Sequence, residues 1–206
     1  MRLNLGCGSI TPSSWQNVDY ALGARIARWP IIGPLARGLG VFSLRWDPKI
    51  YIHDLTTPFP WRERSVDAIY SSHTLEHFDR EAGRRFLAEC RRVLRPGGVI
   101  RIVVPDLAAH VRRYARGELP AENFLEDIDV LTGVGLTGLK RKLAPFVQYP
   151  HKCMYDEVAL LRVMRDVGFE CAPRRPFESD IADIGELELD SRTVDAVIVE
   201  GRRPGD

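Results

Sequence analysis

The sequence of 206 residues has few cysteines and no charge excess. Its four cysteines form no C-x-x-C pair, which favours reduced thiols over a disulfide framework. Lysine and arginine number 29 against 28 acidic residues, so the net charge of +1 gives no basic field for nucleic acid. No apolar run is long enough to cross a bilayer, and there is no internal repeat or low-complexity tract. We therefore expect a single globular domain over residues 1–206, with no nucleic acid as partner.

Acidic residues are also missing from one internal stretch, residues 21–46. Arginines there alternate with apolar and aromatic residues, and Pro30 and Pro34 break any long helix. We interpret the stretch as an insertion that packs over the rest of the fold. The alternative is peripheral contact with anionic lipid or a lipid-linked molecule, since basic and aromatic residues favour a membrane surface. A second insertion, residues 107–150, has short helical patterns and several glycines and is typical of a lid.

The rest of the chain alternates short apolar runs with helical patterns, which predicts an α/β fold with a doubly wound, mostly parallel sheet. Asp79 and Asp156 are expected to cap two of the helices. Thr11 and Pro12 predict a helix of one or two turns in the first crossover. The expected strands number seven and cover residues 3–5, 17–20, 50–55, 66–72, 99–104, 169–172 and 194–199.

Three of the expected strands end in residues suited to a nucleoside. The first runs into Gly6-Cys7-Gly8, and glycine there permits positive φ and close approach of a ligand. Asp19 ends the second strand, where a carboxylate can accept hydrogen bonds from a ribose diol. Asp54 ends the third and could accept from an adenine amino group. Because parallel strands end at one edge of a sheet, we expect these residues to form one binding site.

These positions belong to a wider pattern. The sequence resembles the class I S-adenosylmethionine-dependent methyltransferases of the methyltransferase type 11 kind, especially short bacterial members associated with surface-polysaccharide clusters. The resemblance covers most of the chain outside the two insertions. It implies a Rossmann-like, seven-stranded α/β sheet with an inserted lid. The matching stretches are residues 3–8, 17–19, 54–60, 65–78, 92–98, 104–106 and 151–156.

The resemblance implies a site for S-adenosylmethionine. The residues expected to bind this cofactor are Asn4, Gly6, Cys7, Gly8, Asp19, Tyr20, Asp54, Leu55, Ser71 and Ser72. The chain departs from the family pattern at two positions. Asn4 stands where the family usually has an acidic residue, so we expect weaker binding of the cofactor's ammonium group. Ile10 stands where a third glycine is common, which leaves the shape of the loop open.

The expected reaction is transfer of the sulfonium methyl group to a hydroxyl of a sugar or other small molecule, with a glycan or lipid-linked acceptor included. A hydroxyl needs a base, and a histidine near neutrality suits that role. We expect His73 and His151 to be the catalytic candidates, with Asp106 behind them. Since the first strand begins right after Met1, we expect no signal peptide and a cytoplasmic protein.

His73 to His77 also spell H-x-x-E-H, a pattern found in zinc peptidases. That chemistry needs both histidines on one helix face and a third ligand further along. Here the pattern directly follows an expected strand, so we predict no metal site.

Two other functions are open at this stage. One is an oxidoreductase using NAD or a nucleotide sugar. The missing third glycine and the short spacing from Gly8 to Asp19 argue against it. The other is a non-catalytic, cofactor-binding partner subunit, which Asn4 and the short first crossover keep open.

Overall fold

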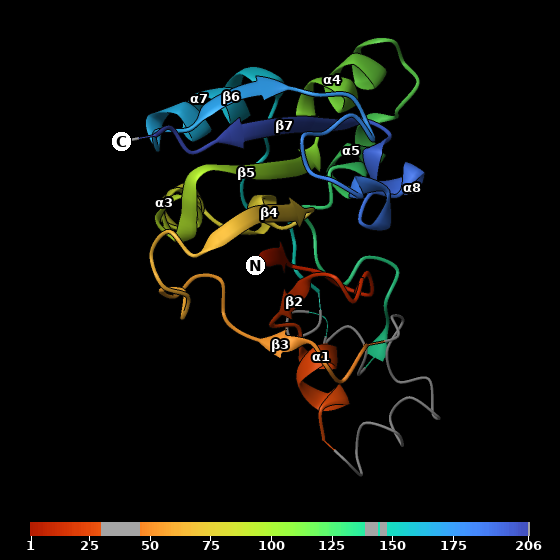
Figure 1. The fold of residues 1–206 in the computed structure, drawn as a ribbon. Helices are drawn as coiled ribbons and strands as arrows, with labels where there is room; N and C mark the ends of the chain where they lie inside the picture. Colours follow the sequence, from red (N-terminus) through yellow and green to blue (C-terminus); the bar gives the residue numbers. More distant parts are fainter. Residues whose placement is uncertain (30–45, 139–143, 145–147, 206) are drawn as a thin grey trace.

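The computed structural model describes residues 1–29, 46–138, 144 and 148–205. Seven strands form one sheet in the order β3-β2-β1-β4-β5-β7-β6 (Figure 1). The pairs among β1 to β5 are parallel, and β7 runs antiparallel to β5 and β6. This confirms the expected mostly parallel, doubly wound sheet. The strands are β1 Arg2–Leu5, β2 Gln16–Asp19, β3 Tyr51–Ile52, β4 Val66–Ser72, β5 Leu94–Pro105, β6 Glu170–Pro173 and β7 Ala196–Arg202.

Asp79 and Asp156 cap their helices as expected. Their carboxylates accept from the amides of Ala82 at 2.8 Å and Ala159 at 2.7 Å. The described helices are α1 Leu22–Ala27, α3 Arg80–Val93, α4 Leu107–Ala115, α5 Ala121–Asp127, α7 Glu157–Asp166 and α8 Asp190–Thr193, with the 3₁₀ turns η1 Leu75–His77 and η2 Ile184–Glu186.

The alternation of side chains along the strands divides the core between the two faces of the sheet. On β5, Ile100 and Ile102 pack with the buried faces of α3 and α7 in the larger cluster. Val99 and Val103 point to the other face and pack in a separate cluster with Ile184 of η2. Because both faces are covered, the strand is apolar almost throughout, as its sequence predicts.

Arg101 interrupts that apolar strand and is fully buried. Its guanidinium donates to Glu188 at 2.6 and 3.0 Å and to Glu200 at 3.3 Å. The same group also donates to the carbonyls of Arg175 and Glu178. Arg101 therefore holds the connection between β6 and β7 against this face of the sheet. Its hydrogen-bond partners come from that connection and from β7.

The expected short helix in the first crossover is not formed. Two asparagines hold this loop instead. The side-chain amide of Asn4 donates to the backbone carbonyl of Ile10 at 2.8 Å and to Oδ1 of Asn17 at 3.0 Å. The side-chain amide of Asn17 in turn donates to the backbone carbonyl of Pro12 at 3.0 Å. These side-chain bonds satisfy backbone carbonyls that a helix would have paired, so the crossover stays a compact loop.

The first insertion lies largely outside the described residues, so lipid contact through residues 21–46 stays a prediction. Its described part contains α1 and Trp29, whose side chain is 61% exposed. In the second insertion the described residues form α4 and α5, near the strand ends of β5 and β7 (Figure 1). Among the helices described here, none combines the length and the apolar character that crossing a membrane requires.

Candidate functional site

A cleft of about 410 Å³ opens at the carboxyl ends of β1, β2 and β4. The predicted site residues in its lining are Gly6, Gly8, Asp19, Tyr20, Asp54, Leu55 and His73. The other lining residues are Ala21, Trp46, Thr56, Thr74, His77, Phe78, Tyr149, Lys152 and Arg192. The structure therefore brings the predicted strand-end residues together around one space, at the point where the strand order reverses between β1 and β4.

The floor of the cleft is the glycine turn after β1. Gly6 and Gly8 have φ values of 72° and 55°, in the left-handed region that favours glycine. A Cβ on Gly6 would lie 2.0 Å from Oγ1 of Thr74, so no side chain fits there. The amides of Gly6 and Cys7 donate to the carbonyl of Val18, at 2.9 and 3.0 Å, and hold the turn against β2. The turn therefore needs glycine for both its conformation and its packing.

Asp19 joins the ends of two strands at this turn. Its Oδ2 accepts from the amide of Gly8 at 2.9 Å, and its Oδ1 accepts from the amide of Ala21 at 2.8 Å. A carboxylate oxygen has two lone pairs, so each oxygen can accept one bond more. Asp19 is thus held rigidly while it can still bind a diol.

Asp54 is held in a tight turn at the end of β3. Its Oδ1 accepts from both the amide and the hydroxyl of Thr56, at 2.9 and 2.7 Å. No donor in the described part of the chain bonds to its Oδ2. This oxygen is therefore a fixed, free acceptor at the cleft.

His73 follows β4 with a φ of 51°. Its amide donates to the carbonyl of Val103 at 2.9 Å, and its Nδ1 lies 3.0 Å from Oγ of Ser72. Burial, with a smaller effect of the positive charge on Arg192, lowers the pKa of His73 to about 4. The imidazole is therefore neutral at pH 7 and a weaker base than the sequence led us to expect.

Two cations line the cleft. Arg192 of α8 lies beside the glycine turn, with Nη2 3.7 Å from where a Cβ on Gly8 would be. Lys152 lies in the segment after the second insertion, with its amide bonded to the carbonyl of Glu76. In the described residues neither side chain forms an ion pair with a carboxylate. The cleft therefore offers two positive charges to a ligand.

Four of the residues predicted to bind cofactor lie behind the cleft. Asn4 holds the first crossover, as described above. Cys7 is buried beneath α1, and burial raises the pKa of its thiol. The hydroxyl of Ser71 donates to the carbonyl of Leu5 at 3.0 Å, and Ser72 contacts His73. Their roles in cofactor binding stay predictions.

Two of the predicted catalytic residues also lie outside the lining. Asp106 caps α4 by accepting from the amide of Ala108 at 2.9 Å, and its other oxygen pairs with Arg112. His151 is 9% exposed and lies behind His77, with ring centroids 5.1 Å apart. Of the three catalytic candidates, His73 is the one that faces the cleft. Their roles remain predictions.

Sequence reasoning missed Trp46, Lys152 and Arg192 as lining residues. Trp46 ends the first insertion, and a Cβ on Gly23 of α1 would lie 2.1 Å from its indole nitrogen. The match of residues 151–156 to the family pattern was a signal for Lys152. Arg192 had none, because it reaches the cleft from a short helix near the end of the chain.

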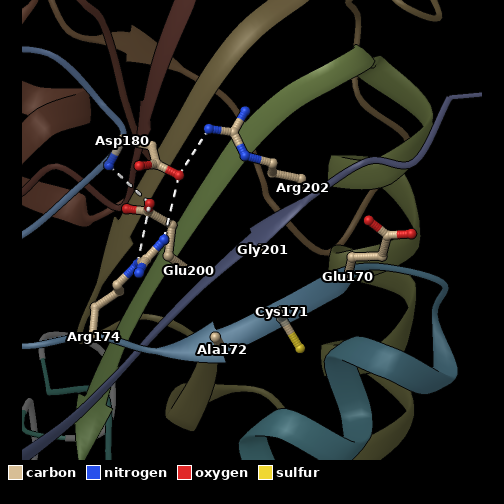
Figure 2. A pocket seen from close by; sticks show the side chains of 8 residues that line it. All are labelled: Glu170, Cys171, Ala172, Arg174, Asp180, Glu200, Gly201 and Arg202. Carbon is tan, nitrogen blue, oxygen red and sulfur yellow. Dashed lines mark hydrogen bonds and ion pairs between the residues drawn. The ribbon is translucent and has the colours of Figure 1, made fainter.

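A second pocket of about 260 Å³ lies at the β6 edge of the sheet (Figure 2). Four of its charged residues, Arg174, Asp180, Glu200 and Arg202, are already paired with one another. Asp180 pairs with Arg174 at 3.3 Å and with Arg202 at 2.7 Å, and Glu200 accepts from the amide of Asp180 at 2.9 Å. Because these charges are compensated, we do not assign a site there.

Comparison with known proteins agrees with this geometry. Residues 35–102 match the model of a family described as "Methyltransferase domain". No curated protein matches the chain. A SAM-dependent methyltransferase from Methanosarcina mazei has a similar structure, with a TM-score of 0.54 at 15% identity, covering 99% of this chain and 92% of that one. The PH0226 protein from Pyrococcus horikoshii OT3 has a TM-score of 0.54 at 14% identity, and the match covers 98% of this chain and 81% of that one.

The apo form of SibL, an S-adenosylmethionine-dependent methyltransferase, is also similar, with a TM-score of 0.53 at 14% identity. This chain is covered to 99% but spans 50% of SibL's length. Similarity at this level of identity shows the fold. The family model covers residues 35–102 and agrees with the resemblance to the class I S-adenosylmethionine-dependent methyltransferases, a class whose cofactor is S-adenosylmethionine.

Proposed function

We propose that this methyltransferase transfers a methyl group to a hydroxyl of a sugar or other small molecule that carries negative charge. The observation that supports this most is the meeting of Gly8, Asp19 and Asp54 at one cleft that also contains two unpaired cations. Glycines and carboxylates suit the donor, while the cations suit anionic groups on either ligand.

The residues around the glycine turn fit the donor. We assign the ribose hydroxyls to Asp19 and the adenine amino group to the free oxygen of Asp54. Arg192, beside Gly8, is placed to neutralise the carboxylate of the methionine part. The bound cofactor supplies an already activated methyl group, so the protein needs only to orient the acceptor and exclude water.

The acceptor is expected on the opposite wall, where His77, Tyr149 and Lys152 lie. The ring centroids of His77 and Tyr149 are 6.4 Å apart, which gives this wall an aromatic surface suited to a sugar ring. Lys152 adds a positive charge for a phosphate or carboxylate. A glycan precursor or a lipid-linked sugar carries all of these features.

His73 also lines the cleft, with its ring neutral. In the tautomer whose Nδ1 donates to the hydroxyl of Ser72, Nε2 can accept a hydrogen bond from the acceptor hydroxyl. A pKa of about 4 makes His73 a weak base that positions the hydroxyl as a hydrogen-bond acceptor. It can take the proton only late in the reaction, when bonding to the methyl carbon has made the oxygen acidic.

The test is titration calorimetry with S-adenosylmethionine and with NAD, followed by assay of S-adenosylhomocysteine release. The acceptor panel should contain nucleotide sugars, sugar phosphates, lipid-linked saccharides and uncharged sugars. We expect binding of S-adenosylmethionine, no binding of NAD, and turnover on anionic acceptors that falls at least tenfold in Lys152→Met. Turnover on uncharged sugars alone would contradict the acceptor class.

The same experiment separates the alternatives. Cofactor binding without turnover on any acceptor would favour the non-catalytic partner subunit, and NAD binding would favour the oxidoreductase. The cytoplasm stays the expected compartment, which the four free cysteines support. Flotation with anionic vesicles, compared with neutral ones, tests the lipid contact expected for residues 21–46.

A further inference from the structure

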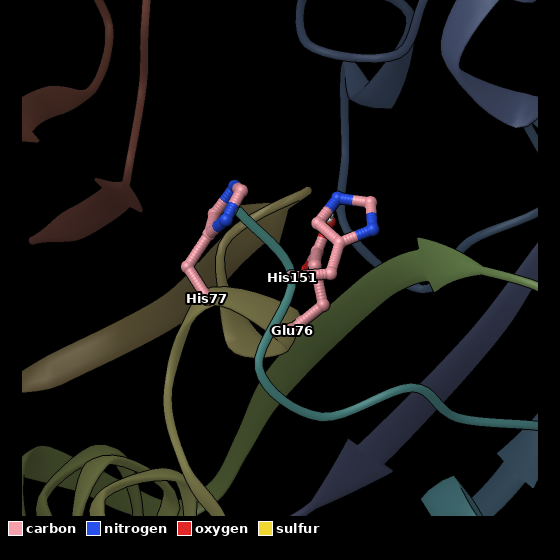
Figure 3. Close-up of side chains that lie close together, drawn as sticks. All are labelled: Glu76, His77 and His151. Carbon is pink, nitrogen blue, oxygen red and sulfur yellow. Dashed lines mark ion pairs between the residues drawn. The ribbon is translucent and has the colours of Figure 1, made fainter. Parts of the chain in front are cut away.

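Two histidines and a glutamate converge beside the cleft. We propose that Glu76, His77 and His151 bind one divalent transition-metal ion (Figure 3). One potential ligand atom from each residue lies within 4.8 Å of the others. The pattern H-x-x-E-H pairs His73 with His77, and the sequence alone predicted no metal site there. The structure instead combines Glu76 and His77 with a histidine from the far side of the second insertion.

Glu76 is the strongest sign of a missing partner. It is fully buried, and no described residue forms a hydrogen bond with either oxygen of its carboxyl group. A buried carboxyl group without partners is costly in either protonation state. A bound cation would remove this cost, since it compensates the charge and occupies the lone pairs.

The histidines are oriented as metal ligands usually are. Nδ1 of His151 lies 2.8 Å from the carbonyl oxygen of Ile128, and Nδ1 of His77 lies 3.4 Å from that of Pro150. A carbonyl oxygen only accepts hydrogen bonds, so each Nδ1 carries the proton and each Nε2 keeps its lone pair. Such a bond from the non-ligating nitrogen is the common second shell of a histidine that binds metal.

The backbone holds the three residues together. The carbonyl of Glu76 accepts from the amides of Lys152 at 2.8 Å and Cys153 at 3.1 Å. These bonds place His151 next to η1, with Nε2 3.9 Å from Oε1 of Glu76. Ligands of a tetrahedral zinc ion lie about 3.3–3.6 Å apart, so side chains whose ligand atoms lie within 4.8 Å of one another must move together by up to about 1 Å.

Two imidazoles and one carboxylate suit zinc and neighbouring first-row ions rather than calcium or magnesium. Three protein ligands also leave a coordination position open. Asp129, 67% exposed, lies with Oδ2 3.9 Å from Nε2 of His151 and is the nearest candidate for that position. Otherwise the position is free for water or a ligand.

The cluster adjoins the wall proposed for the acceptor, because His77 lines the cleft. An ion there can bind the acceptor's hydroxyl oxygen and lower its pKa. The hydroxyl proton then passes to water, and the oxygen's electron pair forms the bond to the methyl carbon as the carbon–sulfur bond breaks. This consequence rests on the proposed function, whereas the metal site itself does not.

The test uses untagged full-length protein, stripped with chelator and titrated with Zn²⁺ and Co²⁺ without methyl donor or acceptor. We expect one Zn²⁺ per chain with micromolar affinity or better, and visible absorption bands of Co²⁺ bound by nitrogen and oxygen. Glu76→Gln and His151→Asn should each weaken binding at least tenfold. His110→Asn is the matched control, because His110 lies in the second insertion, pairs with Asp127 and should leave affinity within twofold.

Absence of stoichiometric Zn²⁺ binding and of Co²⁺ bands in the wild-type protein would overturn the proposal without relying on any variant. Unchanged affinity in both Glu76→Gln and His151→Asn would also overturn it. Because no methyl donor is present, these outcomes are independent of whether the protein methylates the proposed acceptors.

Discussion

Oδ2 of Asp19 accepts a hydrogen bond of 2.9 Å from the amide of Gly8, and this bond joins the ends of β2 and β1 at the floor of the cleft. The bond sets the glycine turn and the carboxylate in one rigid arrangement before any ligand arrives. Preorganisation of this kind reduces the entropy lost on binding. It also means that Asp19 has a structural role in addition to the binding role proposed for it, and experiments must separate the two.

Asp19→Ala should weaken binding of S-adenosylmethionine at least tenfold. Each charge-assisted hydrogen bond to a ribose hydroxyl contributes about 1.5–3 kcal/mol, and the substitution also releases the turn at Gly8. Titration calorimetry measures the effect. Asp156→Ala is the control, since it removes a helix cap away from the cleft and should lower stability by about 1 kcal/mol with unchanged affinity. Equal affinity of Asp19→Ala and wild type would remove the ribose assignment.

Arg101→Met should lower the free energy of unfolding by about 3–5 kcal/mol, because it leaves Glu188 buried without its cation. Urea denaturation measures this change. The same substitution at Arg84, which is 57% exposed and pairs with Asp166, should cost about 1 kcal/mol or less. Adding Glu188→Gln to Arg101→Met should restore a large part of the loss. A loss equal to that of Arg84→Met would show that the buried network contributes little.

His73 should make the protein sensitive to acid. Its pKa is about 4 in the folded protein and about 6.5 when unfolded, so the unfolded chain takes up a proton that the folded one does not. The stabilisation is complete above pH 6.5 and is lost as the pH falls towards 4, by up to about 3 kcal/mol. Urea denaturation between pH 4 and 7, in metal-free buffer, measures it.

His73→Asn is the variant for that measurement, because asparagine tolerates the positive φ at this position. Its stability should depend less steeply on pH over the same range. If wild type and variant lose stability in parallel, His73 is not the group responsible.

Cys7 should react slowly with iodoacetamide in the folded protein at pH 8. Burial raises the pKa of its thiol, so little of the reactive thiolate forms, and the side chain is 3% exposed. Peptide mapping by mass spectrometry should show labelling at least tenfold slower than at Cys153, which is only partly buried. In urea the two rates should converge. Equal rates in the folded protein would contradict the placement of Cys7 beneath α1.

Much of the fold follows from local patterns that the sequence carries by itself. Short apolar runs predicted the strands, and Asp79 and Asp156 marked the starts of α3 and α7 because capping acts within a single helical turn. The strand ends Gly8, Asp19 and Asp54 could be placed together because parallel strands of one sheet end at a common edge.

Other features were decided only by tertiary packing. The positions of Arg192, Lys152 and His151 depend on how distant segments pack, and no local spacing encodes that. For the same reason the sequence could not show that Arg101 has two buried acids as partners, or that asparagines replace a helix in the first crossover. Local patterns determined most of the helices and strands, while long-range contacts decided which charged and polar groups face one another.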